Sequence, residues 1–175
     1  MHALHWTLSL MVLSASHAGS SAQEKQPPLV TRNRVQLNLA GAETALTAAK
    51  KKAAAMGLKS NIAVVDDGGH LLAFARMDGA RPASGATALS KAVSAAMFRQ
   101  ESGTLPAKGE PDVLLSLGIQ TASGGKITPL KGGIPIVIDG QVVGAVGVGG
   151  GSGEQDAEVA KAGVQALLDV LAEKK

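Results

Sequence analysis

The chain has 175 residues, with no cysteine, no tyrosine, two phenylalanines and one tryptophan. The lack of cysteine excludes disulfides, thiolate metal sites, cysteine nucleophiles and haem attached through a C-x-x-C-H motif. The shortage of aromatic side chains argues against a surface that stacks on single-stranded nucleic acid. Aliphatic residues must therefore fill the core, and 22 glycines indicate tight turns and close backbone approaches.

The charge also argues against nucleic acid as a partner. The formal net charge is only +3, and the one basic run, Lys50–Lys52, lies within a helical pattern. Such a run is typical of a solvated helix face. Hydrophobic residues make up 45% of the chain, which at this length is typical of one globular domain.

The N-terminus has the pattern of a secretory signal peptide. A short apolar run, Trp6 to Ala15, is followed by Ser16-His17-Ala18 and Ser20-Ser21-Ala22, which both resemble an A-x-A cleavage site. The run is much shorter than the roughly 20 residues that span a bilayer, so we predict no membrane span. An apolar N-terminal helix of the fold is the alternative.

We therefore predict three parts: a signal peptide at 1–22, a flexible lead-in at 23–33 and a domain at 34–175. The protein would be periplasmic or secreted. Three of the four histidines lie in the predicted signal peptide, so the mature chain would keep only His70.

The rest of the chain predicts helices and β-hairpins in alternation. Apolar residues follow helical spacing in three segments, and two pairs of β-rich runs are joined by D-G turns. A long loop separates the second helix from the second hairpin and contains a short apolar piece. This order predicts an α+β domain with an antiparallel sheet and packed helices. The predicted helices are 35–56, 83–101 and 154–172, the strands 61–65, 71–77, 134–138 and 141–148, and the loop 102–131.

The densest motif is the glycine run 147–153, between the last strand and the last helix. Its backbone amides could accept a carboxylate or phosphate at the helix N-terminus. A tight turn with close packing of helix on strand explains it equally well. It is not a dinucleotide fingerprint, because Ser152 stands where the third glycine belongs. Glu154 and Asp156 follow, either as acids that offset the helix dipole or as acid–base groups or metal ligands.

Three further side chains are candidates, each with a simpler alternative. His70 begins a predicted strand and is either a surface residue or a metal ligand or acid–base group. Arg76, Asp78 and Arg81 cluster after that strand, where an arginine could grip a carboxylate or form an Arg–Asp pair that closes a turn. Lys91 could contact a ligand or lie on a solvated helix face.

Three segments together resemble the GlcG/HbpS family, which includes domains like the C-terminal domain of PduO. They are 61–81, with the pattern D-x-G-G-x-L-x-A-x-x-R-M-D-G, the alanine-rich 83–98, and 131–156, with its glycine run ending in E-Q-D. The resemblance implies a profilin-like α/β/α sandwich that assembles into dimers or larger homo-oligomers. It also implies binding of haem, or in some relatives a corrinoid, and haem degradation in some members.

An exported haem (tetrapyrrole)-binding protein that acts in haem storage, sensing or degradation is the function that the resemblance implies. His70 is the candidate iron ligand, with Met56, Met77, Met97 and Thr121 as other donors. The candidate cofactor-binding residues are His70, Arg76, Lys91, Thr121, Gly149, Gly150, Gly151 and Glu154.

Two other functions stay open. One is an enzyme or accessory protein for a small hydroxy or oxo acid, as in glycolate utilisation. Arg76 and the amides of 147–153 would then hold the carboxylate, while His70 or Glu154 moves a proton. The other is a catalytically silent oligomeric scaffold. No catalytic residue is assigned.

Overall fold

The computed structural model describes residues 30, 34–106 and 108–173. These residues, Val30 apart, belong to the compact unit that spans 33–175, which is described here by itself. The predicted signal peptide lies outside the described residues and stays a prediction. None of the helices in the described ranges is both long enough and apolar enough to cross a membrane.

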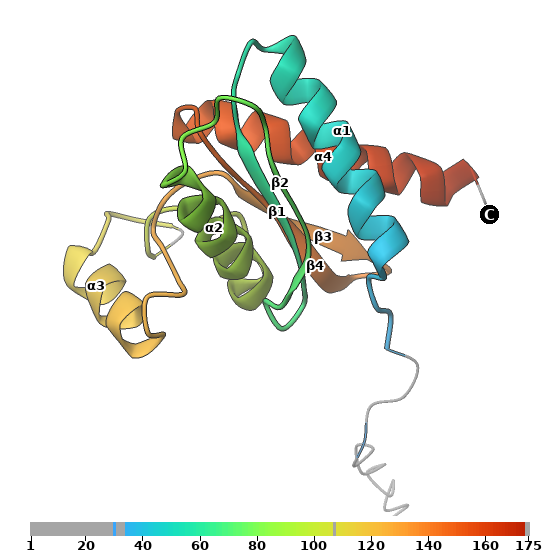
Figure 1. Ribbon diagram of the computed structural model, residues 1–175. Coiled ribbons are helices and arrows are strands. Elements are labelled where there is room, and N and C mark those ends of the chain that lie inside the picture. The colour runs from blue at the N-terminus through green and yellow to red at the C-terminus, as the bar shows by residue number, and fades with distance from the viewer. Residues whose placement is uncertain (1–29, 31–33, 107, 174–175) are drawn as a thin grey trace, which may run out of the picture. The chain divides into compact units, whose positions relative to one another are not determined.

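The unit is built from helices on both faces of one antiparallel sheet with the strand order β2-β1-β4-β3 (Figure 1). Helices α1 and α4 cover one face and α2 covers the other. The predicted α+β sandwich is therefore confirmed. In chain order the elements are α1 (Leu39–Ala55), β1 (Asn61–Asp66), β2 (Leu71–Arg76), α2 (Ser84–Phe98), α3 (Val113–Ala122), β3 (Gly133–Ile138), β4 (Gln141–Gly149) and α4 (Gly153–Glu173).

Both predicted hairpins are present, and local chemistry explains their turns. In the β3–β4 turn, Asp139 and Gly140 both have positive φ, 50° and 74°. A two-residue hairpin turn of this kind matches the right-handed twist of the strands and favours D-G. In the β1–β2 turn, the Asp66 carboxylate accepts hydrogen bonds from the backbone N–H groups of Gly68 and His70.

The two faces of the sheet are packed with side chains of different size. Toward α1 and α4 the sheet presents branched residues such as Ile62, Val64 and Val146, all fully buried. Toward α2 the contacts are mostly alanines, including Ala88 and Ala92. Helix α2 therefore lies closer to the sheet than a helix with larger core residues could.

Glycines in the strands allow this close approach. A Cβ on Gly147 would overlap the carbonyl oxygen of Ala88, and one on Gly133 would overlap that of Lys91. A Cβ on Gly149 would lie 2.6 Å from the carbonyl oxygen of Ser84. These neighbours are helix backbone, which cannot move aside as a flexible side chain can. The strand part of the glycine run is thus explained by packing.

Two predicted helices are shorter than the sequence pattern indicated. Helix α1 begins at Leu39 rather than Val35, because the Asn38 side chain caps it by accepting the Gly41 N–H at 2.9 Å. Val35 precedes the helix yet packs against the core, which is why it fitted the apolar pattern. Helix α2 ends at Phe98, where Arg99 adopts a left-handed conformation.

The prediction of a loop over 102–131 was wrong where the sequence has its short apolar piece, because α3 begins there. Asp112 caps this helix by accepting the Leu115 N–H at 2.8 Å. None of its residues is buried, and Val113 and Leu114 are 78% and 80% exposed. The helix lies to the side of α2, away from the sheet (Figure 1). Periodicity could not reveal it, since it has no face turned to the core.

We expect Gly147→Ala to destabilise the domain by about 1–3 kcal/mol or more, because the new methyl group meets the α2 backbone. Gly118→Ala is the matched control, since nothing lies within 4 Å of a Cβ there. Denaturant unfolding of both variants measures the difference. Equal stabilities would contradict the close packing of α2 on the sheet.

Candidate functional site

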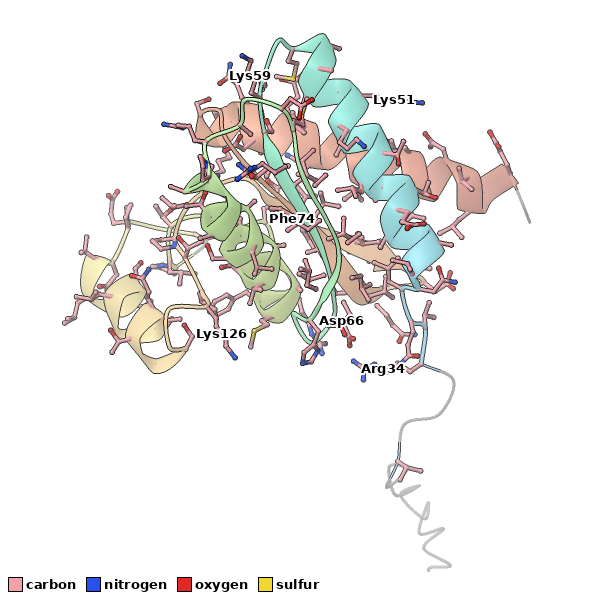
Figure 2. All side chains as sticks on the ribbon, viewed as in Figure 1. Arg34, Lys51, Lys59, Asp66, Phe74 and Lys126 are labelled. Atoms are coloured by element: carbon pink, nitrogen blue, oxygen red, sulfur yellow. The ribbon has the colours of Figure 1, made fainter. Side chains whose placement is uncertain are left out.

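Two pockets lie on different sides of α2. The first, here called the histidine pocket, has a volume of about 410 Å³. It is formed by the β1–β2 turn, the outer side of α2 and the segment after α3; Figure 2 labels Asp66 beside the turn and Lys126 in that segment. Its lining residues are Gly68, Gly69, His70, Ala86, Leu89, Ser90, Val93, Met97, Gly124, Gly125 and Lys126.

Asp66 orients the imidazole of His70. The His70 Nδ1 lies 3.2 Å from both carboxylate oxygens of Asp66. Burial alone would raise the pKa of Asp66, but hydrogen bonds from the backbone and ring of His70 and from the Gly68 amide lower it below its ordinary value. Asp66 is therefore ionised at neutral pH and holds the proton of a neutral imidazole on Nδ1. The Nε2 lone pair is left for another partner, and the His70 side chain is 82% exposed.

This arrangement is the usual one for a histidine that ligates a metal. Such histidines donate their second ring N–H to a carboxylate or carbonyl group, which fixes the tautomer and raises the basicity of the ligating nitrogen. Apolar side chains of α2, among them Leu89 and Val93, form one wall of the pocket, and the half-exposed Met97 adds a thioether. The pocket thus combines an oriented imidazole with an apolar surface.

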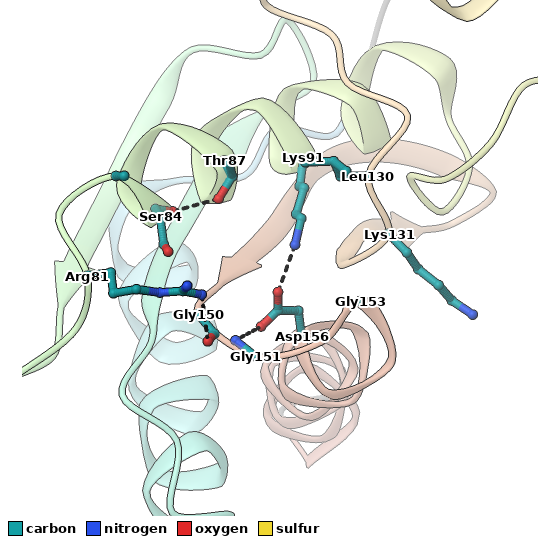
Figure 3. A pocket seen from close by; sticks show the side chains of 11 residues that line it. Arg81, Ser84, Thr87, Lys91, Leu130, Lys131, Gly150, Gly151, Gly153 and Asp156 are labelled. Carbon is teal, nitrogen blue, oxygen red and sulfur yellow. Dashed lines mark hydrogen bonds and ion pairs between the residues drawn. The ribbon is translucent and has the colours of Figure 1, made fainter. Parts of the chain in front are cut away.

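The second pocket, here called the lysine pocket, has a volume of about 340 Å³ and lies between α2 and the start of α4 (Figure 3). It has three basic side chains, from three separate segments of the chain. Its lining residues are Arg81, Ala83, Ser84, Thr87, Lys91, Leu130, Lys131, Gly150, Gly151, Gly153 and Asp156.

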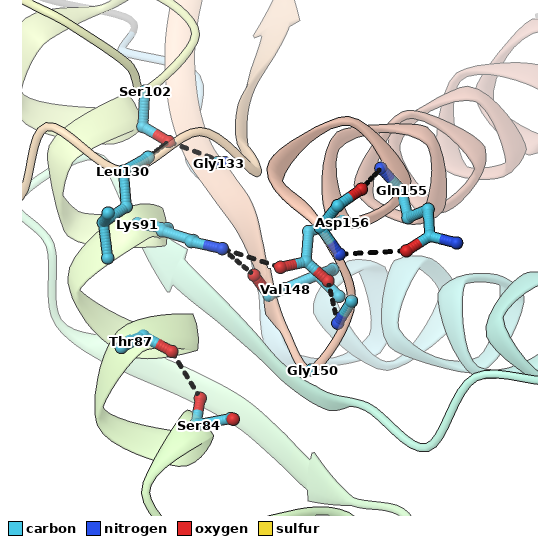
Figure 4. Close-up of polar contacts among 12 residues, drawn as sticks. Ser84, Thr87, Lys91, Ser102, Leu130, Gly133, Val148, Gly150, Gln155 and Asp156 are labelled. Carbon is cyan, nitrogen blue, oxygen red and sulfur yellow. Dashed lines mark hydrogen bonds and ion pairs between the residues drawn. The ribbon is translucent and has the colours of Figure 1, made fainter.

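Lys91 and Asp156 form a buried ion pair in the lysine pocket. The Lys91 Nζ donates to Asp156 Oδ2 at 2.7 Å and to the carbonyl oxygen of Val148 at 2.9 Å (Figure 4). The two side chains are only 6% and 2% exposed. The interpretation of Lys91 as a residue of a solvated helix face was therefore wrong.

The start of α4 uses its own side chains to satisfy its amides. The Gly151 N–H donates to Asp156 Oδ1 at 2.9 Å. The Ser152 N–H donates to Gln155 Oε1, and the Gln155 N–H donates to Ser152 Oγ, which is a capping box. The backbone N–H groups of Gly151 and Ser152, which the sequence suggested as donors to an anion, already have partners within the chain. The S-x-x-Q spacing was the signal for this.

The structure distributes the predicted binding residues over several places. His70 lies in the histidine pocket, whereas Lys91, Gly150 and Gly151 lie in the lysine pocket. Gly149 is buried beneath α2.

The other three predicted residues are exposed. Glu154 pairs with Lys131 at 2.6 Å. Arg76, at the end of β2, and Thr121, on α3, line neither of these two pockets.

His70 does not share a site with the glycine run. In the pairing of β1 with β4, Asn61 lies opposite Gly149, while Asp66 lies opposite Gly144. His70 follows Asp66 and so lies beyond the other end of β1. Of the cluster Arg76, Asp78 and Arg81, the sequence analysis placed Arg76 among the binding residues, whereas the structure places Arg81 at the lysine pocket.

Comparison with family models and with known proteins points to one family. A family model described as "HbpS-like: Haem degrading protein HbpS-like" matches residues 37–165, from before α1 into α4. Protein GlcG of Escherichia coli strain K12 is 38% identical over 117 residues, which cover 67% of this chain and 84% of GlcG.

Solved structures share the fold. Protein ORFY of Klebsiella pneumoniae superposes with a TM-score of 0.69 at 32% identity, covering 81% of this chain and 98% of ORFY. A PduOC:heme complex superposes with a TM-score of 0.65 at 25% identity, covering 75% of this chain and 95% of PduOC.

We expect the Lys91–Asp156 pair to show strong energetic coupling. Asp156→Asn and Lys91→Met each leave a buried charge without its partner, which costs about 3–5 kcal/mol. The double variant should lose clearly less than the sum of the two single losses. The exposed pair Lys161–Glu101, 2.9 Å apart, is the control, and Lys161→Met should cost less than about 1 kcal/mol. Additive losses in the double variant, measured by denaturant unfolding, would contradict the coupling.

Proposed function

Since the chain belongs to the HbpS-like family, we propose that it binds haem and that His70 is the protein ligand of the iron. The family membership agrees with the resemblance found in the sequence. The observation that carries the proposal is the contact of His70 with Asp66, which orients the imidazole at the histidine pocket. When bound, haem supplies an iron centre that can change oxidation state.

The residues of the histidine pocket fit a haem group. Leu89 and Val93 offer an apolar surface to the macrocycle, and Lys126 offers a cation to a propionate. Asp66 accepts the hydrogen bond of Nδ1–H, which turns Nε2 toward an iron in the pocket. Met97, the other donor of this pocket that the sequence suggested, is not an iron ligand in this proposal.

The finer role that we propose is haem storage or sensing. His70 lies on a turn and is 82% exposed, which suits a haem that enters and leaves. Haem degradation is the alternative role, and the description of the matching family model as haem degrading supports it. None of the relatives named above carries a corrinoid in its name, and haem is the cofactor that we propose.

Assembly into a homo-oligomer is part of the same proposal. Val113, Leu114 and Leu117 on α3 are exposed aliphatic residues that a second copy could cover. Sedimentation velocity measures the oligomeric state, and a strict monomer at micromolar concentration would contradict the prediction.

We also propose that the protein is exported, on the strength of the apolar run and small residues of 1–22. Expression of the full chain in a Gram-negative host should place it in the periplasm with Gln23 as its first residue. N-terminal sequencing checks this. A cytoplasmic protein that retains Met1 would contradict export.

The haem proposal is tested with protein that begins at Gln23, in which His70 is the only histidine. Hemin should produce a saturable shift of the Soret band. His70→Ala should abolish or strongly weaken the shift, because it removes the imidazole. Asp66→Asn should weaken binding about 10–100-fold, because it removes the charge that holds Nδ1–H.

Met97→Leu is the control in the same pocket, since it keeps the apolar volume and removes the sulfur. Its Soret shift should match that of the unmodified protein. Absence of any saturable shift in the unmodified protein would refute haem binding. An unchanged shift in His70→Ala would refute only the assignment of His70 as the ligand.

A further inference from the structure

The lysine pocket is separate from the histidine pocket and has a different chemistry. We propose that it binds a small monocarboxylate, with Arg81 as the charge partner of the carboxylate and Lys91 as a second donor. The proposal stands on the contacts of these two side chains, the charge of the pocket and its volume. It does not depend on haem binding.

The guanidinium group of Arg81 has unused hydrogen-bond donors. Its backbone carbonyl accepts a hydrogen bond from Asn61 Nδ2 at 3.0 Å, which fixes the loop between β2 and α2. In residues 34–106 and 108–173 its guanidinium group has a single long contact, 3.4 Å, to the carbonyl oxygen of Gly150 (Figure 3). No carboxylate pairs with it among the described residues. A guanidinium with this many unused N–H groups matches the two oxygens of a carboxylate.

Lys91 has one donor left. Its ammonium group carries three N–H bonds. Two of them are used by Asp156 and by the carbonyl oxygen of Val148. The side chain is 94% buried yet lines the pocket, and its third N–H has no protein partner within the described part of the chain. A ligand oxygen in the pocket would satisfy it.

The charges of the pocket favour an anion with a single negative charge. The ion pair of Lys91 with Asp156 is neutral overall, and that of Lys131 with Glu154 is neutral as well. Arg81 is left as the uncompensated cation. The volume of about 340 Å³ lies at the lower end of the range for small-molecule sites. Leu130 and Ala83 provide apolar contact for a short carbon chain.

The N-terminal amides of α4 are not the binding group in this proposal. Gly151 and Ser152 donate to Asp156 and Gln155 within the chain itself. The ligand is therefore held by side chains, which substitution can test one at a time.

The experiment is isothermal titration of the protein with acetate, butanoate and benzoate at constant ionic strength. Acetamide and benzamide are the neutral controls of matched shape. We expect saturable binding of at least one carboxylate and none of the amides. Arg81→Gln should weaken that binding about tenfold or more, because it removes a charge-assisted hydrogen bond. Arg81 is exposed, so the variant should keep its fold.

Arg76→Gln is the matched control variant. It changes the net charge by the same amount, lies five positions away in the sequence and lines neither pocket. Its carboxylate affinity should equal that of the unmodified protein. Equal weakening in Arg76→Gln and Arg81→Gln would mean that only the general charge of the protein matters, and would overturn the proposal.

Two further measurements distinguish the lysine pocket from the histidine pocket and from a general anion site. His70→Ala should bind the carboxylate normally, and Arg81→Gln should show a normal Soret shift with hemin, so the two proposals fail independently. Inorganic phosphate should bind more weakly than the best carboxylate. Tighter binding of phosphate, or binding of no carboxylate at all, would overturn the assignment.

Discussion

The rest of the structure depends on the close contact between the backbone of α2 and the sheet. Strand glycines such as Gly147 let the helix backbone rest directly on β4, where any side chain would collide with it. This contact sets the position of α2, and α2 contributes a wall to both pockets. A shift of the helix by the width of a methyl group would change the lysine pocket and the histidine pocket together. The alanines of α2 and the strand glycines therefore together set the distance between the helix and the sheet.

The buried pair of Lys91 and Asp156 connects α2 to α4 across the lysine pocket. Transfer of two charges from water to the interior costs about as much as their attraction returns, and an apolar pair of similar volume is often as stable. A gain in folding stability is therefore a weak explanation for the presence of this buried ion pair. A better reason is position: the pair holds an ammonium group at a pocket wall, while Asp156 also accepts the Gly151 N–H at the start of α4. The histidine pocket uses the same principle, since Asp66 orients His70.

Much of the fold followed from local sequence patterns. The hairpin turns, the helix over 154–172 and the small-residue helix after the first hairpin were all predicted, because each depends on residues a few positions apart. Helix α3 was missed, since all of its residues are at least partly exposed and it lacks the core-facing stripe that periodicity detects. His70 was found because it is the only histidine after residue 22. Arg81 was recognised only as a member of a cluster with Arg76 and Asp78, because nothing in the sequence shows which of the two arginines faces a pocket.

The sequence by itself determined the helices and strands other than α3, the antiparallel hairpins, the family resemblance and the lack of any cysteine chemistry. Only the tertiary structure decided which side chains share a pocket. Lys91 and Asp156 are 65 positions apart, and Arg81 and Gly150 are 69 apart. Turns, caps and helical periods arise from neighbours along the chain, so the sequence displays them. Contacts between distant segments arise from how closely α2 packs on the sheet, and that distance is visible only when the glycines and the helix are seen together.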